Sequence, residues 1–133
     1  MKMQDKYITF PEGIPGFETL TQFHLIKEQG AFCLLQSIEQ PEIGFTLLDP
    51  SQLNIKYNPL IPKNYFEKIG NGEDNEYAVY VVTTIRENIS DCTVNLAGPL
   101  LIHTEKRVGI QVIVGNEEYQ VRHKLEDLIR GRE

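Results

Sequence analysis

The chain has 133 residues, of which 41% are hydrophobic and 24% are charged, and its 13 Lys and Arg against 19 Asp and Glu give a net charge of −6. This length predicts one domain, over residues 1–133, and the acidic balance disfavours nucleic acid as the primary partner, because nucleic-acid binders displace counterions with a basic face. The charge suits a basic protein partner, although solubility alone explains it more simply. No apolar segment resembles a signal peptide or spans a bilayer, which predicts a cytoplasmic protein.

The first predicted element is a short strand that ends at Phe10 and leads into FPEGIPGF, residues 10–17. Proline fixes φ and glycine accepts backbone conformations closed to other residues, and this loop alternates the two: Pro11, Gly13, Pro15 and Gly16. Its Pro15-Gly16 pair predicts a type II turn. We expect the loop to hold Phe10 and Phe17 at the rim of a β-structure. A loop ordered in advance is also a good binding element, and Ile14 and Phe17 suit both roles.

Short runs rich in β-branched and aromatic residues follow, separated by turn residues. They predict strands at 23–27, 31–38, 44–49, 77–85, 93–97, 100–103, 109–114 and 119–125. The 77–85 run is apolar on both faces, which is typical of a central strand. Gly98-Pro99 predicts a bend or bulge, and Gly115-Asn116 predicts a two-residue hairpin turn before the last strand. Short strands with tight turns indicate a mainly β fold, an antiparallel barrel or sandwich.

Alternation assigns the faces of the last two predicted strands. In 109–114 one face carries Ile110, Val112 and Val114, and in 119–125 one face carries Tyr119, Val121, His123 and Leu125. Two short helices complete the pattern. Residues 62–70 begin with a proline suited to the first helical turn and end at a glycine, and residues 124–133 form a turn or two of terminal helix or fray.

The sequence carries no pattern that indicates an enzyme, a cofactor or a metal site. His24, His103 and His123 have no neighbour at metal-ligand spacing, and strand histidines are usually structural. Cys33 lies in an apolar run as a small buried hydrophobe, and a disulfide with Cys92 is disfavoured in a reducing compartment. A small barrel that stacks RNA bases on surface aromatics is the alternative function. Its candidates, Tyr57, Tyr65, Tyr77, Tyr80 and Tyr119, are better explained as strand core with a solvated hydroxyl.

The segment DPSQLNIKYNPLIPKNYF, residues 49–66, is the best candidate for a protein-binding surface. Its three prolines interrupt regular strand pairing, yet it retains considerable apolar area. Such a segment either folds back on the barrel as a lid or presents a groove, and the lid is the simpler interpretation. The predicted partner-binding residues are Ile14, Phe17, Asp49, Leu53, Ile55 and Tyr57. We expect Asn95 and Arg122 to support the fold through hydrogen bonds.

Five stretches, in this order and spacing, resemble the flagellar assembly factor FliW family: ITFPEGIPGF, FCLLQS, LLDP, TVNLAGPLLIH and GIQVIVGNEEYQVRH. The resemblance covers residues 8–125 and is most specific where FPEGIPGF combines with NLAGPLLIH and the Y-x-V-R-H pattern. The segment after LLDP departs from the family pattern, since Lys56 and Lys63 make it more basic. A partner contact made there would therefore differ in strength or specificity.

The resemblance implies a compact antiparallel β-barrel-like fold with one or two short helices and no enzymatic activity. It also implies two protein partners, flagellin and CsrA, a dimeric repressor that binds the leader of flagellin messenger RNA. Free FliW antagonises CsrA, whereas unsecreted flagellin occupies FliW and leaves CsrA free to repress. The expected protein is thus a cytoplasmic partner switch, monomeric when unbound, that contacts neither nucleic acid nor membrane.

Overall fold

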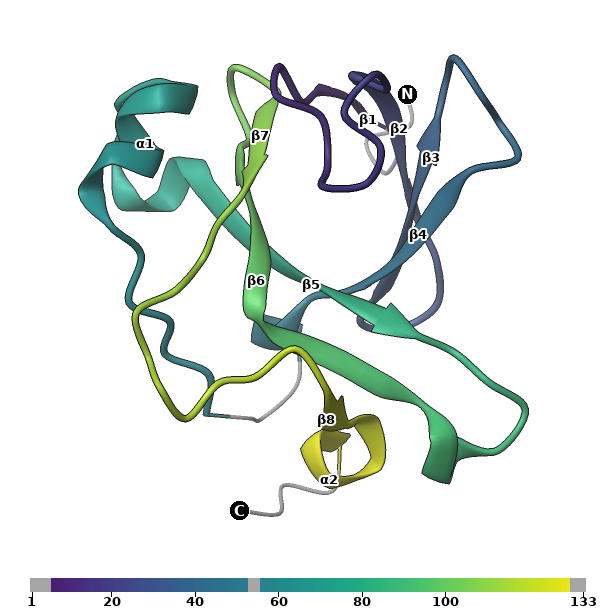
Figure 1. The fold of residues 1–133 in the computed structure, drawn as a ribbon. Helices are drawn as coiled ribbons and strands as arrows, with labels where there is room; N and C mark the ends of the chain where they lie inside the picture. Colours follow the sequence, from purple (N-terminus) through teal and green to yellow (C-terminus); the bar gives the residue numbers. More distant parts are fainter. Residues whose placement is uncertain (1–5, 53–55, 130–133) are drawn as a thin grey trace.

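A closed β-barrel forms the centre of the computed structural model, which describes residues 6–52 and 56–129. The strands of this part of the chain are β1 (Lys6–Thr9), β2 (Gln22–Lys27), β3 (Phe32–Ser37), β4 (Gly44–Leu48), β5 (Tyr77–Thr84), β6 (Thr93–His103), β7 (Val108–Gln111) and β8 (His123–Lys124). They lie in the order β5-β4-β3-β2-β1-β7-β6-β8, and the pairing of β5 with β6 closes a seven-stranded ring (Figure 1). The predicted mainly β fold is confirmed, and of the two predicted architectures the structure forms the barrel and not the sandwich.

All neighbours in the ring are antiparallel except β1 and β7, which pair in parallel at Thr9 and Val108. The predicted strands at 93–97 and 100–103 form one long strand, β6. The predicted irregularity at Gly98-Pro99 is confirmed, because the β5–β6 register moves from Tyr80 opposite Leu100 to Val82 opposite Asn95. Asn95 supports this bulge, since its Oδ1 accepts hydrogen bonds from the backbone N–H groups of Ala97 (3.0 Å) and Gly98 (2.9 Å).

The predicted hairpin at Gly115-Asn116 is wrong. Strand β7 ends at Gln111, and β8 is two residues long and pairs with β6 instead. Residues 119–122 are not a strand, and Val121, predicted to be buried, is 66% exposed. The expected supporting role of Arg122 is also wrong: the side chain is exposed and forms no hydrogen bond with the described residues. By contrast, Ile110, Val112 and Val114 are buried on one face, as their alternation predicts.

Three hydrophobic clusters build the core. The first fills the barrel and includes Phe10, Phe23, Leu35, Leu47 and Leu100. The second lies outside β5 and β6, under Leu125 of helix α2 (Leu125–Ile129) and the segment before it. The third lies between the barrel and helix α1 (Lys63–Ile69), where Ile69 packs with Leu101 and Ile110.

Both predicted helices are confirmed; residues 130–133 of the second lie outside the described residues. The 3₁₀ turns are η1 (Pro50–Gln52), η2 (Asp74–Glu76) and η3 (Ile89–Asp91).

The loop at residues 10–17 closes one end of the barrel. Phe17 N–H donates to the Ile14 carbonyl (2.6 Å) and Gly16 has φ 91°, so the predicted type II turn is confirmed. Phe10 is fully buried and meets Phe23 edge to face, with ring centroids 5.5 Å apart. Phe17 is half-buried and meets Phe45 in the same way at 5.4 Å. The loop therefore supplies core side chains to the barrel, which is the structural role expected of it.

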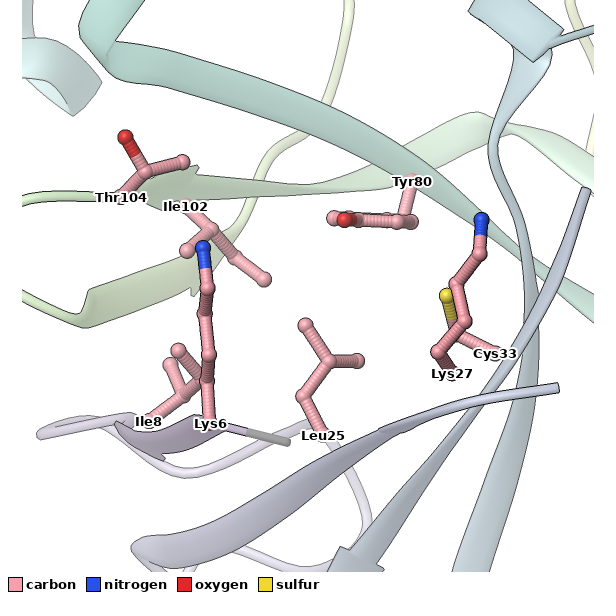
Figure 2. A pocket seen from close by; sticks show the side chains of 8 residues that line it. All are labelled: Lys6, Ile8, Leu25, Lys27, Cys33, Tyr80, Ile102 and Thr104. Carbon is pink, nitrogen blue, oxygen red and sulfur yellow. The ribbon is translucent and has the colours of Figure 1, made fainter. Parts of the chain in front are cut away.

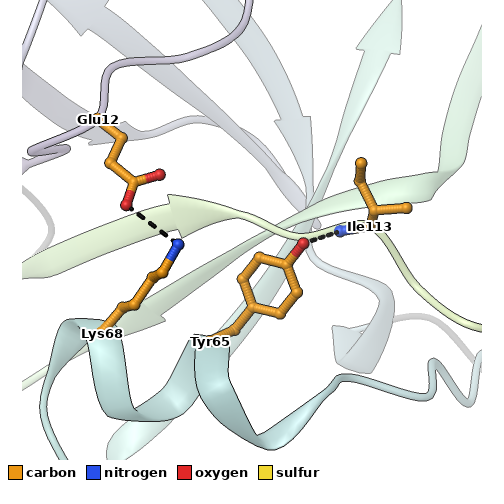
Figure 3. A network of polar contacts seen from close by, with 4 residues as sticks. All are labelled: Glu12, Tyr65, Lys68 and Ile113. Atoms are coloured by element: carbon orange, nitrogen blue, oxygen red, sulfur yellow. Dashed lines mark hydrogen bonds and ion pairs between the residues drawn. The ribbon is translucent and has the colours of Figure 1, made fainter.

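Two polar contacts connect α1 to its surroundings (Figure 3). Lys68 Nζ lies 3.4 Å from Glu12 Oε2, which joins the helix to the 10–17 loop. Both side chains are about half exposed, so this pair contributes little to stability, about 0–1 kcal/mol. The backbone N–H of Ile113 donates to the Tyr65 hydroxyl oxygen (3.4 Å). No helix among the described residues is long and apolar enough to cross a membrane.

Candidate functional site

The segment at residues 56–62, which we call the strap, runs along the outside of the barrel and is fastened at both edges. The Tyr57 hydroxyl donates to the Leu96 carbonyl of β6 (2.6 Å), and its ring lies against Tyr119 with centroids 4.8 Å apart. Asn58 N–H donates to the Tyr119 hydroxyl oxygen (2.9 Å). The lid interpretation of this segment therefore describes the strap.

Asn116 completes the attachment of the strap. Its Oδ1 accepts from Leu60 N–H (2.7 Å), and its Nδ2 donates to the Asn58 carbonyl (3.2 Å). The Gly115 N–H donates to the Leu60 carbonyl (3.0 Å). The Gly115-Asn116 pair thus provides hydrogen-bond partners for the backbone N–H and C=O groups of the strap, whose prolines exclude it from a sheet. The side chain of Leu60 remains 62% exposed on this surface.

A groove of about 490 Å³ lies between the strap, η1 and the start of β5. It brings together two of the predicted partner-binding residues, Asp49 and Tyr57, beside Pro59, Tyr77 and Val79. Asp49 Oδ1 accepts from the backbone N–H (3.0 Å) and the hydroxyl (2.7 Å) of Ser51, which fixes the carboxylate at the end of β4. Burial, and to a lesser extent the neighbouring Tyr119, raises the pKa of Tyr57, so its hydroxyl stays a protonated donor.

The other predicted partner-binding residues are dispersed. Ile14 is 4% exposed, so its side chain belongs to the core of the free protein, and Phe17 shows only part of its ring. Both lie in the loop that closes the barrel, not beside the groove. Leu53 and Ile55 lie outside the described residues. Partner binding by these six residues stays a prediction.

Sequence reasoning missed an apolar surface patch beside α2. Ile85, Ile89 and Ile129 are each about half exposed and line a groove of about 480 Å³ with the buried Leu125 and Cys92. The signal was present: Ile85 and Ile89 stand in TTIRENIS, where a strand pattern ends and charged residues begin. Contiguous exposed apolar groups of this kind mark interaction surfaces.

The FliW protein family model matches residues 2–125. The chain belongs to the FliW family. It is similar to the flagellar assembly factor FliW of Thermotoga sp. strain RQ2, with 37% identity over 131 residues that cover 96% of this chain and 88% of the relative. The FliW of Geobacillus sp. strain WCH70 is 36% identical and covers 89% and 83% of the two chains. A crystal structure of the flagellar assembly factor FliW superposes with a TM-score of 0.82 at 34% identity, over 90% of this chain and 84% of that one.

Four tyrosine hydroxyls and one histidine of this FliW family member form hydrogen bonds with the backbone. The hydroxyls of Tyr57 and Tyr77 donate to backbone carbonyls, and those of Tyr65 and Tyr119 accept from backbone N–H groups. His103 is buried, and its Nδ1 accepts from Lys106 N–H (3.2 Å). Cys33 and Cys92 are buried free thiols. The described residues contain no cluster of His, Cys, Asp or Glu able to hold a metal ion.

Proposed function

We propose that this FliW family member is a cytoplasmic flagellar assembly factor that binds flagellin and antagonises the translational repressor CsrA. Membership of the family carries the proposal, since its relatives are named flagellar assembly factors. The role is a non-enzymatic partner switch: flagellin binding releases CsrA, so that flagellin synthesis follows secretion. A switch of this kind requires the two partners to exclude each other, directly or through conformation.

The strap and the groove beside it form the surface that we assign to a partner. Asp49 supplies a fixed carboxylate, and Tyr57 and Pro59 supply apolar wall. Glu117 and Glu118 are exposed on the segment that holds the strap. An RNA-binding repressor must present basic surface, so CsrA is the partner that Asp49, Glu117 and Glu118 suit, although the strap itself also carries the exposed Lys56. Flagellin then competes through an overlapping contact or through the exposed apolar patch beside α2.

Competition is the experiment that tests the switch. CsrA immobilised with the bound protein is exposed to increasing flagellin, and the bound fraction is measured. We expect flagellin to displace the protein from CsrA in a saturable manner. Independent binding of both partners at full occupancy would refute the switch while leaving the family assignment intact.

Charge reversal tests the electrostatic part of the proposal. We expect Glu117→Lys with Glu118→Lys to weaken CsrA binding by roughly fivefold or more for each charge and to alter flagellin binding much less, because charges at the rim of an interface chiefly change association. The matched control is Glu28→Lys with Glu42→Lys, which makes the same charge change in exposed turns of β2–β4. Equal losses for both partners would contradict the electrostatic assignment.

A conservative variant tests the groove. Asp49→Asn removes the carboxylate charge and retains an oxygen for the two hydrogen bonds from Ser51. We expect weaker partner binding at unchanged thermal stability, and unchanged binding would exclude Asp49 from the interface.

A gel-shift titration with single-stranded RNA addresses the alternative function, since tight binding at moderate salt would make RNA the primary ligand.

A further inference from the structure

The interior of the barrel contains a hollow that partner binding does not explain. Its volume is about 310 Å³, and it lies at the end of β1–β3 remote from the 10–17 loop (Figure 2). The register fixes this position: Thr9 and Gln22 border the loop, whereas Lys6 pairs with Leu25 and Lys27 pairs with Cys33 at the other end. The loop thus closes one end of the barrel, and the hollow marks the other.

The lining combines an apolar wall with two ammonium groups. Ile8, Leu25 and Ile102 are at most 6% exposed, so the aliphatic surface is almost withdrawn from water. Lys6 and Lys27 stand on either side of Leu25, and the ring of Tyr80 lies across the hollow from Leu25 (Figure 2). An apolar cavity of this size with a few convergent polar groups is the usual form of a small-molecule site.

Neither lysine is neutralised within the described part of the chain. Lys6 forms no hydrogen bond or ion pair there, and Lys27 donates only to the Gly30 carbonyl (3.3 Å). The protein carries a net charge of −6, and yet no carboxylate of residues 6–52 and 56–129 lines this hollow. Two unpaired ammonium groups at the edge of an apolar cavity favour an anionic ligand.

Tyr80 adds a neutral donor to the same hollow. Its hydroxyl has no hydrogen-bond partner among residues 6–52 and 56–129, and burial is the main cause that raises its pKa to about 12. The thiol of Cys33 also has a raised pKa, chiefly because of burial and despite the opposing effect of Lys27. The carboxylate of Asp49 acts on both groups through its charge, and that of Glu28 acts on the Cys33 thiol, but neither residue is part of the lining of the hollow. The polar lining therefore offers donors and positive charge.

We propose that this hollow binds the carboxylate of a short aliphatic acid, with the apolar chain against Ile8, Leu25 and Ile102. Lys6 and Lys27 neutralise the carboxylate, and the Tyr80 hydroxyl donates to it. Such a ligand matches the two properties of the hollow at once, an apolar wall and unpaired positive charge. The inference concerns a different part of the molecule from the strap and does not depend on either protein partner.

Titration of the full-length protein with sodium hexanoate, followed by amide chemical shifts, tests the proposal. We expect saturable shifts at Leu25, Cys33 and Tyr80 with a Kd at or below about 1 mM. Hexanamide retains the chain without the charge, and acetate retains the charge without the chain, so each should bind at least tenfold more weakly. A short apolar peptide with a free C-terminus tests the other source of a carboxylate, and tighter binding of this peptide than of hexanoate would overturn the assignment to a free acid.

Lysine variants localise the charge. We expect Lys6→Gln with Lys27→Gln to weaken hexanoate binding at least tenfold, because two charge-assisted contacts are lost. Lys63→Gln, at an exposed position in α1, removes the same kind of charge elsewhere and should leave binding unchanged. Absence of saturable shifts in the wild-type protein, or equal binding by the double variant and the wild type, would overturn the proposal.

Discussion

Gly109 in β7 is the position where a single methyl group is expected to disturb the closed end of the barrel. A Cβ built on Gly109 would lie 2.6 Å from Cζ and 2.8 Å from Cε2 of Phe10. Phe10 is fully buried and rests edge to face on Phe23. The aromatic side chain that begins the 10–17 loop therefore packs directly on the backbone of β7, and only glycine leaves room for it.

The geometry sets the size of the effect. Ordinary van der Waals contact begins at 3.4 Å, so the ring must withdraw by about 0.8 Å in Gly109→Ala. The ring is fully buried and already contacts Phe23, and overpacking at such a site costs about 1–3 kcal/mol. For a chain of this size, each kcal/mol lowers Tm by roughly 3–5 °C. Urea and thermal unfolding of Gly109→Ala should therefore show a loss of several degrees with an unchanged m-value.

A control variant and a double-mutant cycle test whether the clash with Phe10 causes the loss of stability. Gly115→Ala is the matched control, since its Cβ would meet Leu60 only at 3.8 Å, and it should be nearly neutral. Phe10→Leu removes the ring atoms that clash, so the double variant Phe10→Leu/Gly109→Ala should be more stable than the sum of the single effects predicts. A loss in Gly109→Ala no greater than in Gly115→Ala, or strict additivity in the double-mutant cycle, would refute the packing argument.

Three other perturbations follow from hydrogen bonds and shifted pKa values. Tyr57→Phe removes the partly buried hydrogen bond to β6 and should lower the free energy of unfolding in urea by about 1 kcal/mol, whereas Tyr7→Phe, at a side chain 57% exposed, should change it very little. Equal losses would contradict the role of the strap. Burial raises the pKa of Tyr80 from 10.0 to about 12, so the stability it contributes is present below pH 10 and is lost as the pH rises toward 12. Tyr80→Phe should flatten that alkaline loss, and an unchanged slope would contradict it. Desolvation raises the pKa of Glu39, but hydrogen bonds from Gln22 and Thr21 outweigh it and lower the pKa below 4.5. The contribution of Glu39 to folding stability is therefore present above pH 4.5 and is lost as the pH falls through the lower pKa of the folded state. Glu39→Gln should reduce this acid-dependent loss, and Glu42→Gln, in the same turn, should not.

Local patterns predicted the parts of the fold that depend on neighbouring residues. The turn at Pro15-Gly16 needs only a fixed φ followed by a positive φ, and the sequence states both. The buried face of Ile110, Val112 and Val114 follows from alternation even though the strand itself ends at Gln111. Extended backbone places alternate side chains on opposite faces whether or not a neighbouring strand is present.

The errors concern partners that are distant in sequence. Residues 119–125 alternate like a strand, but Tyr119 turns its hydroxyl to Asn58, 61 residues away in the sequence, and Leu125 packs under the barrel wall. These residues bind the strap instead of forming a strand, because its prolines interrupt strand pairing and leave backbone groups that need other hydrogen-bond partners. Local periodicity carries no information about such distant hydrogen bonds. The parallel β1–β7 contact that completes the ring is equally hidden, because it joins Thr9 to Val108.

The same distinction between local patterns and distant contacts applies to the candidate site. One proline-interrupted segment predicts both Asp49 and Tyr57 as partner-binding residues, and the structure places both on one groove. Ile14 is predicted because a rigid loop suits binding, but the same rigidity serves burial, and the side chain fills the barrel end. The hollow beside Lys6 and Lys27 was not found from the sequence, because its lining comes from β1, β2, β3, β5, β6 and the residue after β6.

Closure of the barrel restricts how partners can be recognised. Each of the strands β1–β7 has a neighbour on both sides, which leaves a partner few strand edges to extend. Within the described residues the least paired edge is the seam between β1 and β7, which is held by the single pair Thr9 and Val108. Side-chain surfaces open to a partner include the grooves beside the strap and α2 and the hollow at the barrel end. Recognition through side chains depends on shape and charge more than on shared backbone hydrogen bonds. The two partners that we propose would then bind a shell whose strands need not rearrange, and substitutions on the grooves should separate the two affinities while leaving the fold unchanged.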